Sequence, residues 1–147
     1  MAHLLSISVV VGPSSTAHAG SGKMKMARAD EFGKPDRAGF EALLFEPFQE
    51  YRGMLFRKSA FDPTLIDRRL QTLPPEEVQR EINHTHLFLY AADMQIQRQW
   101  THELEQCWSS RLAAEFPSVR VKLLREERPE EIIVTFWKVS ISAEATA

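Results

Sequence analysis

The clearest pattern in the chain is a run of hydrophobic residues at helical spacing in its second half. Between Pro75 and Pro117 there is no other proline and no glycine, so no helix breaker interrupts this stretch. The apolar residues that form one slowly drifting stripe are Ala92, Ile96, Trp100, Leu104, Cys107, Trp108, Leu112 and Phe116. The polar residues expected on the opposite, solvated side are Gln95, Gln97, Arg98, Glu103, Glu105 and Gln106. The pattern is typical of an amphipathic helix, which we predict over about residues 86–115.

The segment Asn83-His84-Thr85-His86 weakens this helical pattern, because its residues have low helix propensity. We therefore predict one helix over residues 75–82, a break or kink near 83–85, and the long helix after it. Proline at the start of the first helix and glutamates in its first turn support that boundary. The alternative is that the apolar run over residues 87–90 forms a buried strand.

A further helix is predicted near the start of the folded region. The residues that fall near helical spacing are Phe40, Leu43, Leu44, Phe48 and Tyr51. Proline inside a helix removes a hydrogen bond and clashes with the preceding turn. We therefore expect Pro47 to end or kink this helix near Glu46.

The next signals are a short apolar run and a helix start. Residues 54–57 follow a glycine and read as a short strand. Asp62 can cap the free amides of a first helical turn, and Pro63 suits the first helical position. The apolar face of the helix that we predict there consists of Leu65, Ile66, Leu70 and Leu73.

After Pro117 the hydrophobic period changes from helical to alternating. Val119, Val121 and Leu123 alternate with basic residues, and a charged turn containing proline separates them from an apolar segment over residues 132–141. Two such segments predict a β-hairpin. Because the second strand is apolar on both faces and a hairpin alone is marginally stable, we expect it to lie centrally in a sheet. Candidate neighbours are strands over residues 54–57 and 5–10, or a strand from a second subunit.

Together these elements predict an α+β protein. It has three to four helices, including the long one, packed on a small antiparallel sheet with a C-terminal β-hairpin. We divide the chain into a flexible N-terminal extension over residues 1–35, a single α+β domain over 36–142 and a tail over 143–147.

The N-terminal extension has three interpretations. Alternating apolar and polar residues favour a strand over residues 5–10. In the second interpretation Met24 or Met26 is the true start of the protein, and the residues before it are a non-structural extension. The third interpretation is a secretory signal cleaved near Ala19. We expect a cytoplasmic protein, with export after that cleavage as the alternative.

Composition narrows the classes of function. The 147 residues are 44% hydrophobic and 26% charged, which is typical of a globular domain and not of a disordered or collagen-like chain. With 18 basic and 20 acidic residues the net charge is −2, so no nucleic-acid partner is expected. No stretch approaches the roughly 20 apolar residues of a membrane span. One cysteine excludes an internal disulfide, and the absence of phosphate-binding and zinc motifs gives no reason to expect a cofactor.

Histidines provide the only local cluster with metal-ligand character. On a strand, His84 and His86 would share a face and could reach one ion, whereas on a helix they would point apart. The spacing matches no standard zinc signature, so cap or surface positions are the simpler interpretation. Cys107 lies on the apolar stripe and is expected to serve packing.

Two classes of function follow from these patterns. The first is a small, cofactor-free module that binds a protein partner or a second copy of itself, with Trp108, Phe136 and Ile141 as interface residues. The alternative is a ligand-binding or enzymatic domain, although no catalytic constellation is visible in the sequence. Its pocket would lie between the long helix and the sheet, with His86 or His102 as the polar group. The ligand-binding residues predicted for that pocket are Tyr90, Trp100, His102 and Trp137.

Overall fold

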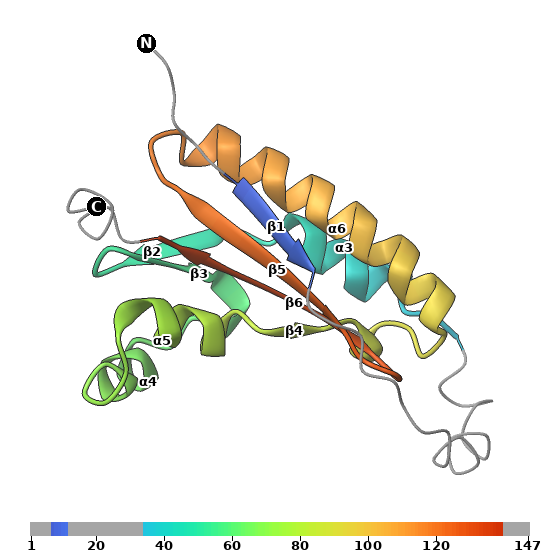
Figure 1. Cartoon of the computed structure of the whole chain (residues 1–147), viewed down its shortest axis with the longest axis horizontal. Helices are drawn as coiled ribbons and strands as arrows, with labels where there is room; N and C mark the ends of the chain where they lie inside the picture. Colours follow the sequence, from blue (N-terminus) through green and yellow to red (C-terminus); the bar gives the residue numbers. More distant parts are fainter. Residues whose placement is uncertain (1–6, 12–33, 140–147) are drawn as a thin grey trace.

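The computed structural model describes residues 7–11 and 34–139, and its elements run from a first strand to a C-terminal hairpin. Most of the predicted N-terminal extension, the cleavage position near Ala19, Ile141 and the predicted tail over 143–147 lie outside the described residues. The described part has the predicted α+β arrangement, with a long helix and a β-hairpin near the C-terminus (Figure 1).

The main sheet has four strands in the order β1-β5-β6-β4. Strand β5 (Val121–Glu127) and strand β6 (Ile132–Lys138) form the predicted hairpin, and β6 also pairs with the short antiparallel strand β4 (Thr85–His86). Strand β1 (Ile7–Val11) runs parallel to β5, at a place where the alternating sequence had suggested a strand. The sheet is therefore mixed, with β6 in a central position between β5 and β4.

One face of this sheet is covered by two helices, α3 (Arg37–Phe45) and α6 (Met94–Glu115) (Figure 1). The long helix α6 begins at Met94, later than the predicted start near residue 86. Its start is set by Asp93, whose side chain accepts hydrogen bonds from the amides of the first turn at 2.8 and 3.2 Å. Helix α3 ends at Phe45, next to the predicted boundary at Glu46.

The beginning of the predicted long helix is a short strand and a 3-10 turn rather than α-helix. Helix α5 (Pro75–Ile82) has the predicted bounds, and strand β4 and a 3-10 turn over Leu87–Leu89 follow it. Leu87 is fully buried in the main core, and β4 hydrogen-bonds to β6. These tertiary contacts outweigh the helical spacing of the apolar residues in this stretch.

A separate two-stranded sheet lies beside the main one. Strand β2 (Phe48–Tyr51) and strand β3 (Met54–Arg57) form a hairpin, so the predicted strand over 54–57 exists but does not join the main sheet. Positive φ angles of 52° at Arg52 and 78° at Gly53 suit the tight turn of such a hairpin. Residues after Pro47 had also fitted the helical pattern, and their strand shows that a short apolar run does not fix the element type.

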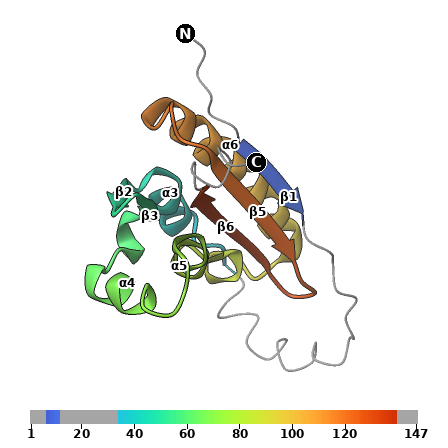
Figure 2. The ribbon, with the colours of Figure 1, turned by 60° about the vertical axis from the view of Figure 1, so that its left-hand side comes forward.

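Helices α4 and α5 complete the fold beyond β6, on the side away from β5 (Figure 2). Helix α4 (Pro63–Arg69) begins as predicted, with the side chain of Asp62 accepting from the Leu65 amide at 3.2 Å. The larger hydrophobic core joins α3 and α6 to the sheet, and a smaller one joins β3 to α4 and α5. The buried residues of the smaller core are Met54, Phe56, Ile66 and Val78.

Two amide side chains of the α5 segment join β3 to β6. Gln79 Oε1 accepts hydrogen bonds from the amides of Leu55 and Lys138, at 3.1 and 2.8 Å. Asn83 Nδ2 donates to the carbonyl oxygens of Leu55 and Phe136, at 2.8 and 3.0 Å. These side chains thus satisfy edge groups of both strands, which would otherwise be buried without partners.

The polar side of α6 is less solvated than its sequence suggested. Gln97 is fully buried, and its Oε1 accepts a hydrogen bond from the Ile132 amide at 2.8 Å. Glu105 is buried and forms two hydrogen bonds with the guanidinium of Arg125 on β5, at 2.7 and 2.9 Å. Both positions were predicted to face solvent, and both instead tie α6 to the hairpin.

A salt bridge at the surface joins α3 to α6. Arg37 donates to both carboxylate oxygens of Glu103, at 2.7 and 2.9 Å, and also to Glu41. The guanidinium lies 5.3 and 5.2 Å from the ring centroids of Phe40 and Trp100. The hydrogen bonds from Arg37 lower the pKa of Glu103 below its ordinary value.

We expect the substitution Arg37→Gln to raise the pKa of Glu103 toward that of a free glutamate. The pKa of Glu103 is lower in the folded state than in the unfolded state. The pairing with Arg37 therefore stabilises the fold at pH values above the unfolded-state pKa, and this stabilisation is lost as the pH falls through the folded-state pKa. NMR titration of the side-chain carboxyl carbon measures the shift, and Arg68→Gln, on an exposed residue of α4, is the control. An unchanged pKa in Arg37→Gln would show that the pairing does not persist in solution.

Candidate functional site

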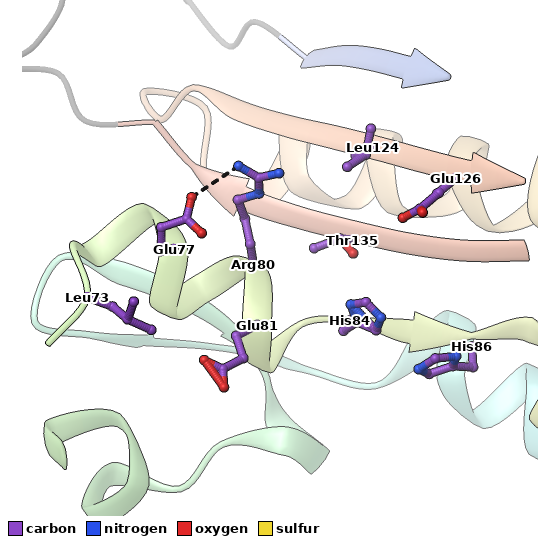
Figure 3. A pocket seen from close by; sticks show the side chains of 9 residues that line it. All are labelled: Leu73, Glu77, Arg80, Glu81, His84, His86, Leu124, Glu126 and Thr135. Carbon is purple, nitrogen blue, oxygen red and sulfur yellow. Dashed lines mark hydrogen bonds and ion pairs between the residues drawn. The ribbon is translucent and has the colours of Figure 1, made fainter. Parts of the chain in front are cut away.

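A cleft of 730 Å³ opens on the face of the main sheet opposite α6. Alternation along β5 and β6 places Leu124, Glu126 and Thr135 on this face, while Val121, Leu123 and Phe136 pack in the larger core. Figure 3 shows the cleft walled by α5 on one side and by the sheet on the other. The residues that line it are Leu73, Glu77, Arg80, Glu81, His84, His86, Leu124, Glu126 and Thr135.

Two histidines at the β4 end of the cleft lie next to each other. The ring centroids of His84 and His86 are 4.7 Å apart, with their planes inclined by 55°. Thr85 between them is buried, and its hydroxyl bonds to the Asn83 carbonyl at 3.2 Å. The extended backbone at β4 therefore presents both imidazoles on one side, as the strand interpretation of this segment required.

One of these imidazoles has a fixed orientation. His86 Nδ1 lies 2.7 Å from a carboxylate oxygen of Glu131, in the turn that precedes β6. An ionised carboxylate only accepts hydrogen bonds, so Nδ1 is the donor. In a neutral ring that arrangement leaves Nε2 of His86 with a lone pair for another partner.

The environment of the second imidazole favours its uncharged form. Burial lowers the pKa of His84, and the neighbouring His86 lowers it further. Neither ring nitrogen of His84 has a hydrogen-bond partner within residues 34–139 of the structure. In its neutral form His84 therefore offers an acceptor nitrogen to a ligand.

The other charged residues of the cleft wall have partners of opposite charge. Arg80 on α5 bonds to Glu77 at 3.3 Å and lies 4.6 Å from the ring centroid of Trp137. Glu81 pairs with Arg69 at 3.2 Å. Glu126 is paired in the same way with Arg128, at 2.8 Å. The charges of the cleft wall are thus compensated among protein side chains. Polar atoms of the wall that have no hydrogen bond in the described structure include Nε2 of His86 and both ring nitrogens of His84.

The aromatic residues predicted to bind a ligand do not form one pocket. Tyr90 and Trp100 both contact Phe40 beneath α3, with ring centroids 6.1 and 4.7 Å from the Phe40 centroid. His102 is exposed on α6, whereas Trp137 packs on the opposite face of the sheet. The space predicted to be a pocket between α6 and the sheet is filled by core side chains. Within the described residues, the predicted pocket is therefore absent from that position.

Two of the three predicted interface residues lie inside the molecule, and the third, Ile141, is outside the described residues. Trp108 and Phe136 are both 0% exposed, and their rings contact each other with centroids 5.3 Å apart. A side chain without accessible surface cannot dock a partner, so the interface assignment does not hold for these two residues. Their burial follows from the strand order, because β6 is central and its Phe136 side faces α6.

The histidine pair has no third metal-ligating neighbour in the described part of the chain. No group of three or more histidine, cysteine, aspartate or glutamate side chains there is arranged to hold a metal ion. Cys107 is half-buried on α6, where its Sγ donates to the Leu44 carbonyl at 3.4 Å and burial raises its thiol pKa. A raised thiol pKa fits the predicted packing role and opposes a role as nucleophile.

Several cleft residues were not recognised from the sequence. Arg80 lies only four positions before His84, but on helix α5 and not on the strand that carries the histidines. Glu131 lies far from them along the chain, and Thr135 was assigned only to an apolar strand. The alternation of Leu124, Glu126 and Thr135 with core residues could have placed them on one sheet face. Nothing local in the sequence indicates that Glu131 contacts His86, since 45 positions separate them.

Comparisons with protein-family models, with curated proteins and with solved structures found no match to this chain. In the part of the chain that the structure describes, no helix is long and apolar enough to cross a membrane. The functional assignment therefore depends on the geometry of the cleft.

Proposed function

We propose that this chain is a ligand-binding domain whose cleft, on the face of the sheet opposite α6, takes a small polar molecule. The observation that carries the proposal is the oriented imidazole of His86, which Glu131 fixes through Nδ1 while Nε2 stays available. Because the His86 ring is already oriented in the free protein, a ligand can donate a directional hydrogen bond to Nε2 without a loss of side-chain entropy at His86.

The charge pattern indicates what kind of molecule would fit. Each acidic side chain of the cleft wall is paired with an arginine, so these side chains give little net attraction for a charged organic molecule. Leu73 and Leu124 add apolar surface. We infer an uncharged ligand with a hydroxyl or amide donor for His86 and a short apolar part for the leucines.

Self-association, the other class predicted from the sequence, has less support. It required tryptophans or the apolar strand at the surface, but Trp108 is fully buried and Trp137 is 8% exposed. Within residues 34–139, the large hydrophobic side chains that are exposed are Phe45, Phe88 and Leu89. We assign no reaction, because no hydrogen bond joins the Thr135 hydroxyl to either cleft histidine in the described structure.

The test is an NMR screen of the full chain against uncharged hydroxyl- and amide-bearing fragments, in buffer containing EDTA. Binding should shift the imidazole signals of His84 and His86 and leave those of His102 unchanged. His86→Ala should weaken the best fragment by about tenfold, the cost of one good hydrogen bond. His102→Ala, on an exposed residue of α6, is the matched control.

Two results would contradict this function. In the first, the chain is folded but no fragment moves the cleft signals, or His86→Ala binds a fragment as tightly as the original chain. In the second, the only changes are at Phe88 and Leu89 and follow protein concentration, which would favour self-association instead.

A further inference from the structure

The histidine pair has the spacing of two ligands on one metal ion. A metal–nitrogen bond of about 2.1 Å places each ring centroid roughly 3.2 Å from the ion. Two rings on a tetrahedral ion are then about 5.2 Å apart, and two rings at a right angle about 4.5 Å. The observed 4.7 Å between His84 and His86 lies between these values. The separation of the two rings is therefore compatible with both histidines binding one ion, once their free nitrogens turn toward it.

A second, independent feature is the carboxylate behind one ring. Metal-bound histidines usually donate their other ring nitrogen to a carboxylate, which fixes the tautomer and makes the ligating nitrogen more basic. Glu131 occupies that position behind His86, 2.7 Å from Nδ1. Nε2 is thereby left as the ligating atom of His86. His84 has both nitrogens without a hydrogen-bond partner in the described structure, so either can complete the pair.

We propose that His84 and His86 bind one divalent transition-metal ion, such as Zn²⁺, in the cleft. The inference rests on the proposed function in that it uses the same cleft. Where the ion is bound, it occupies Nε2 of His86, and a ligand oxygen attaches to the ion instead of to that nitrogen. The described chain supplies no third ligand of the usual types, so the remaining positions are open to water or to that oxygen. With two protein ligands, the affinity for Zn²⁺ should be lower than that of structural sites with four protein ligands.

Titration of the full chain, without a histidine tag, with ZnCl₂ tests the proposal, using calorimetry and the imidazole NMR signals. We expect one ion per chain and shifts at both cleft histidines. His84→Ala and His86→Ala should each weaken binding at least tenfold, because each removes half of the protein ligands. Glu131→Gln should weaken it by about tenfold while the amide spectrum stays that of a folded chain.

Matched variants separate this site from the other histidines. His102→Ala should bind Zn²⁺ as the original chain does, and so should the double variant His3→Ala/His18→Ala. No binding at 1 mM ZnCl₂, or binding that survives both His84→Ala and His86→Ala, would overturn the metal site. The fragment screen is run with EDTA and the titration without fragments. A missing metal site therefore leaves the proposed ligand cleft standing, and the converse also holds.

Discussion

Replacing Asn83 by alanine is expected to lower the free energy of unfolding by about 3–5 kcal/mol, which is a large part of the stability of a domain this size. The amide of Asn83 donates to the carbonyls of Leu55 and Phe136, and its oxygen accepts from the Arg57 amide at 3.0 Å. Asn83 itself is fully buried. Alanine would leave three backbone groups without partners, and each costs about 1–3 kcal/mol when water cannot reach it. Urea denaturation followed by circular dichroism measures the change.

A second variant tests whether the stabilisation comes from the hydrogen-bond donors of Asn83 or only from the volume of its side chain. Asn83→Asp keeps the shape of the side chain but replaces the NH₂ donor by an oxygen that faces two carbonyl oxygens. We expect it to be at least as destabilising as the alanine variant at neutral pH. Gln71→Ala, at an exposed amide after α4, should change stability by less than about 0.5 kcal/mol. A small effect of both Asn83 substitutions would mean that β3 and β6 are held together mainly by packing.

Trp108→Ala is the substitution with the next largest expected effect, about 3–5 kcal/mol. Trp108 is fully buried, contacts Phe48 and Phe136 edge-on, and directs Nε1 toward the Leu43 carbonyl at 3.4 Å. Its removal leaves a cavity between α6 and the sheet that rigid neighbouring elements cannot close. Urea denaturation should be followed by circular dichroism, because the substitution also removes a fluorophore.

Trp108→Phe keeps the measurement possible if the alanine variant does not fold. It retains most of the apolar volume and loses the long hydrogen bond, so we expect a loss of about 1–2 kcal/mol. Trp100→Ala serves as the control, because this half-buried ring should cost clearly less than Trp108. A loss below about 1 kcal/mol for Trp108→Ala would contradict the packing described for the larger core.

Local chemistry predicted several elements correctly. The Asp62-Pro63 start of α4, the bounds of α5 and the hairpin of β5 and β6 follow from capping, proline positions and alternation. The start of α6 was placed too early, because the apolar residues after His86 fit a helix as well as they fit a buried turn. Buried polar residues were missed for a different reason. Gln97 faces inward because its partner is the amide of Ile132, which only the folded chain brings close.

The candidate site was predictable to a lesser degree. A strand interpretation placed His84 and His86 on one face, but the same residues on a helix would point apart, and local propensity left both possibilities open. The carboxylate behind His86 and the arginine across the cleft come from other elements. Core side chains fill the space between α6 and the sheet where the pocket was predicted, and the cleft opens on the other face of the sheet.

The hydrogen bonds of Gln79 and Asn83 to β3 and β6 also protect the molecule from aggregation. Because these amides replace a neighbouring strand, undocking of α5 would uncover the free edges of β3 and β6 together. Uncovered edges are templates for pairing with strands of other chains, which is the first step of sheet-type aggregation. The eight-residue helix α5 therefore protects the edges of both sheets from pairing with other chains, and its docking depends on the side-chain amides of Gln79 and Asn83.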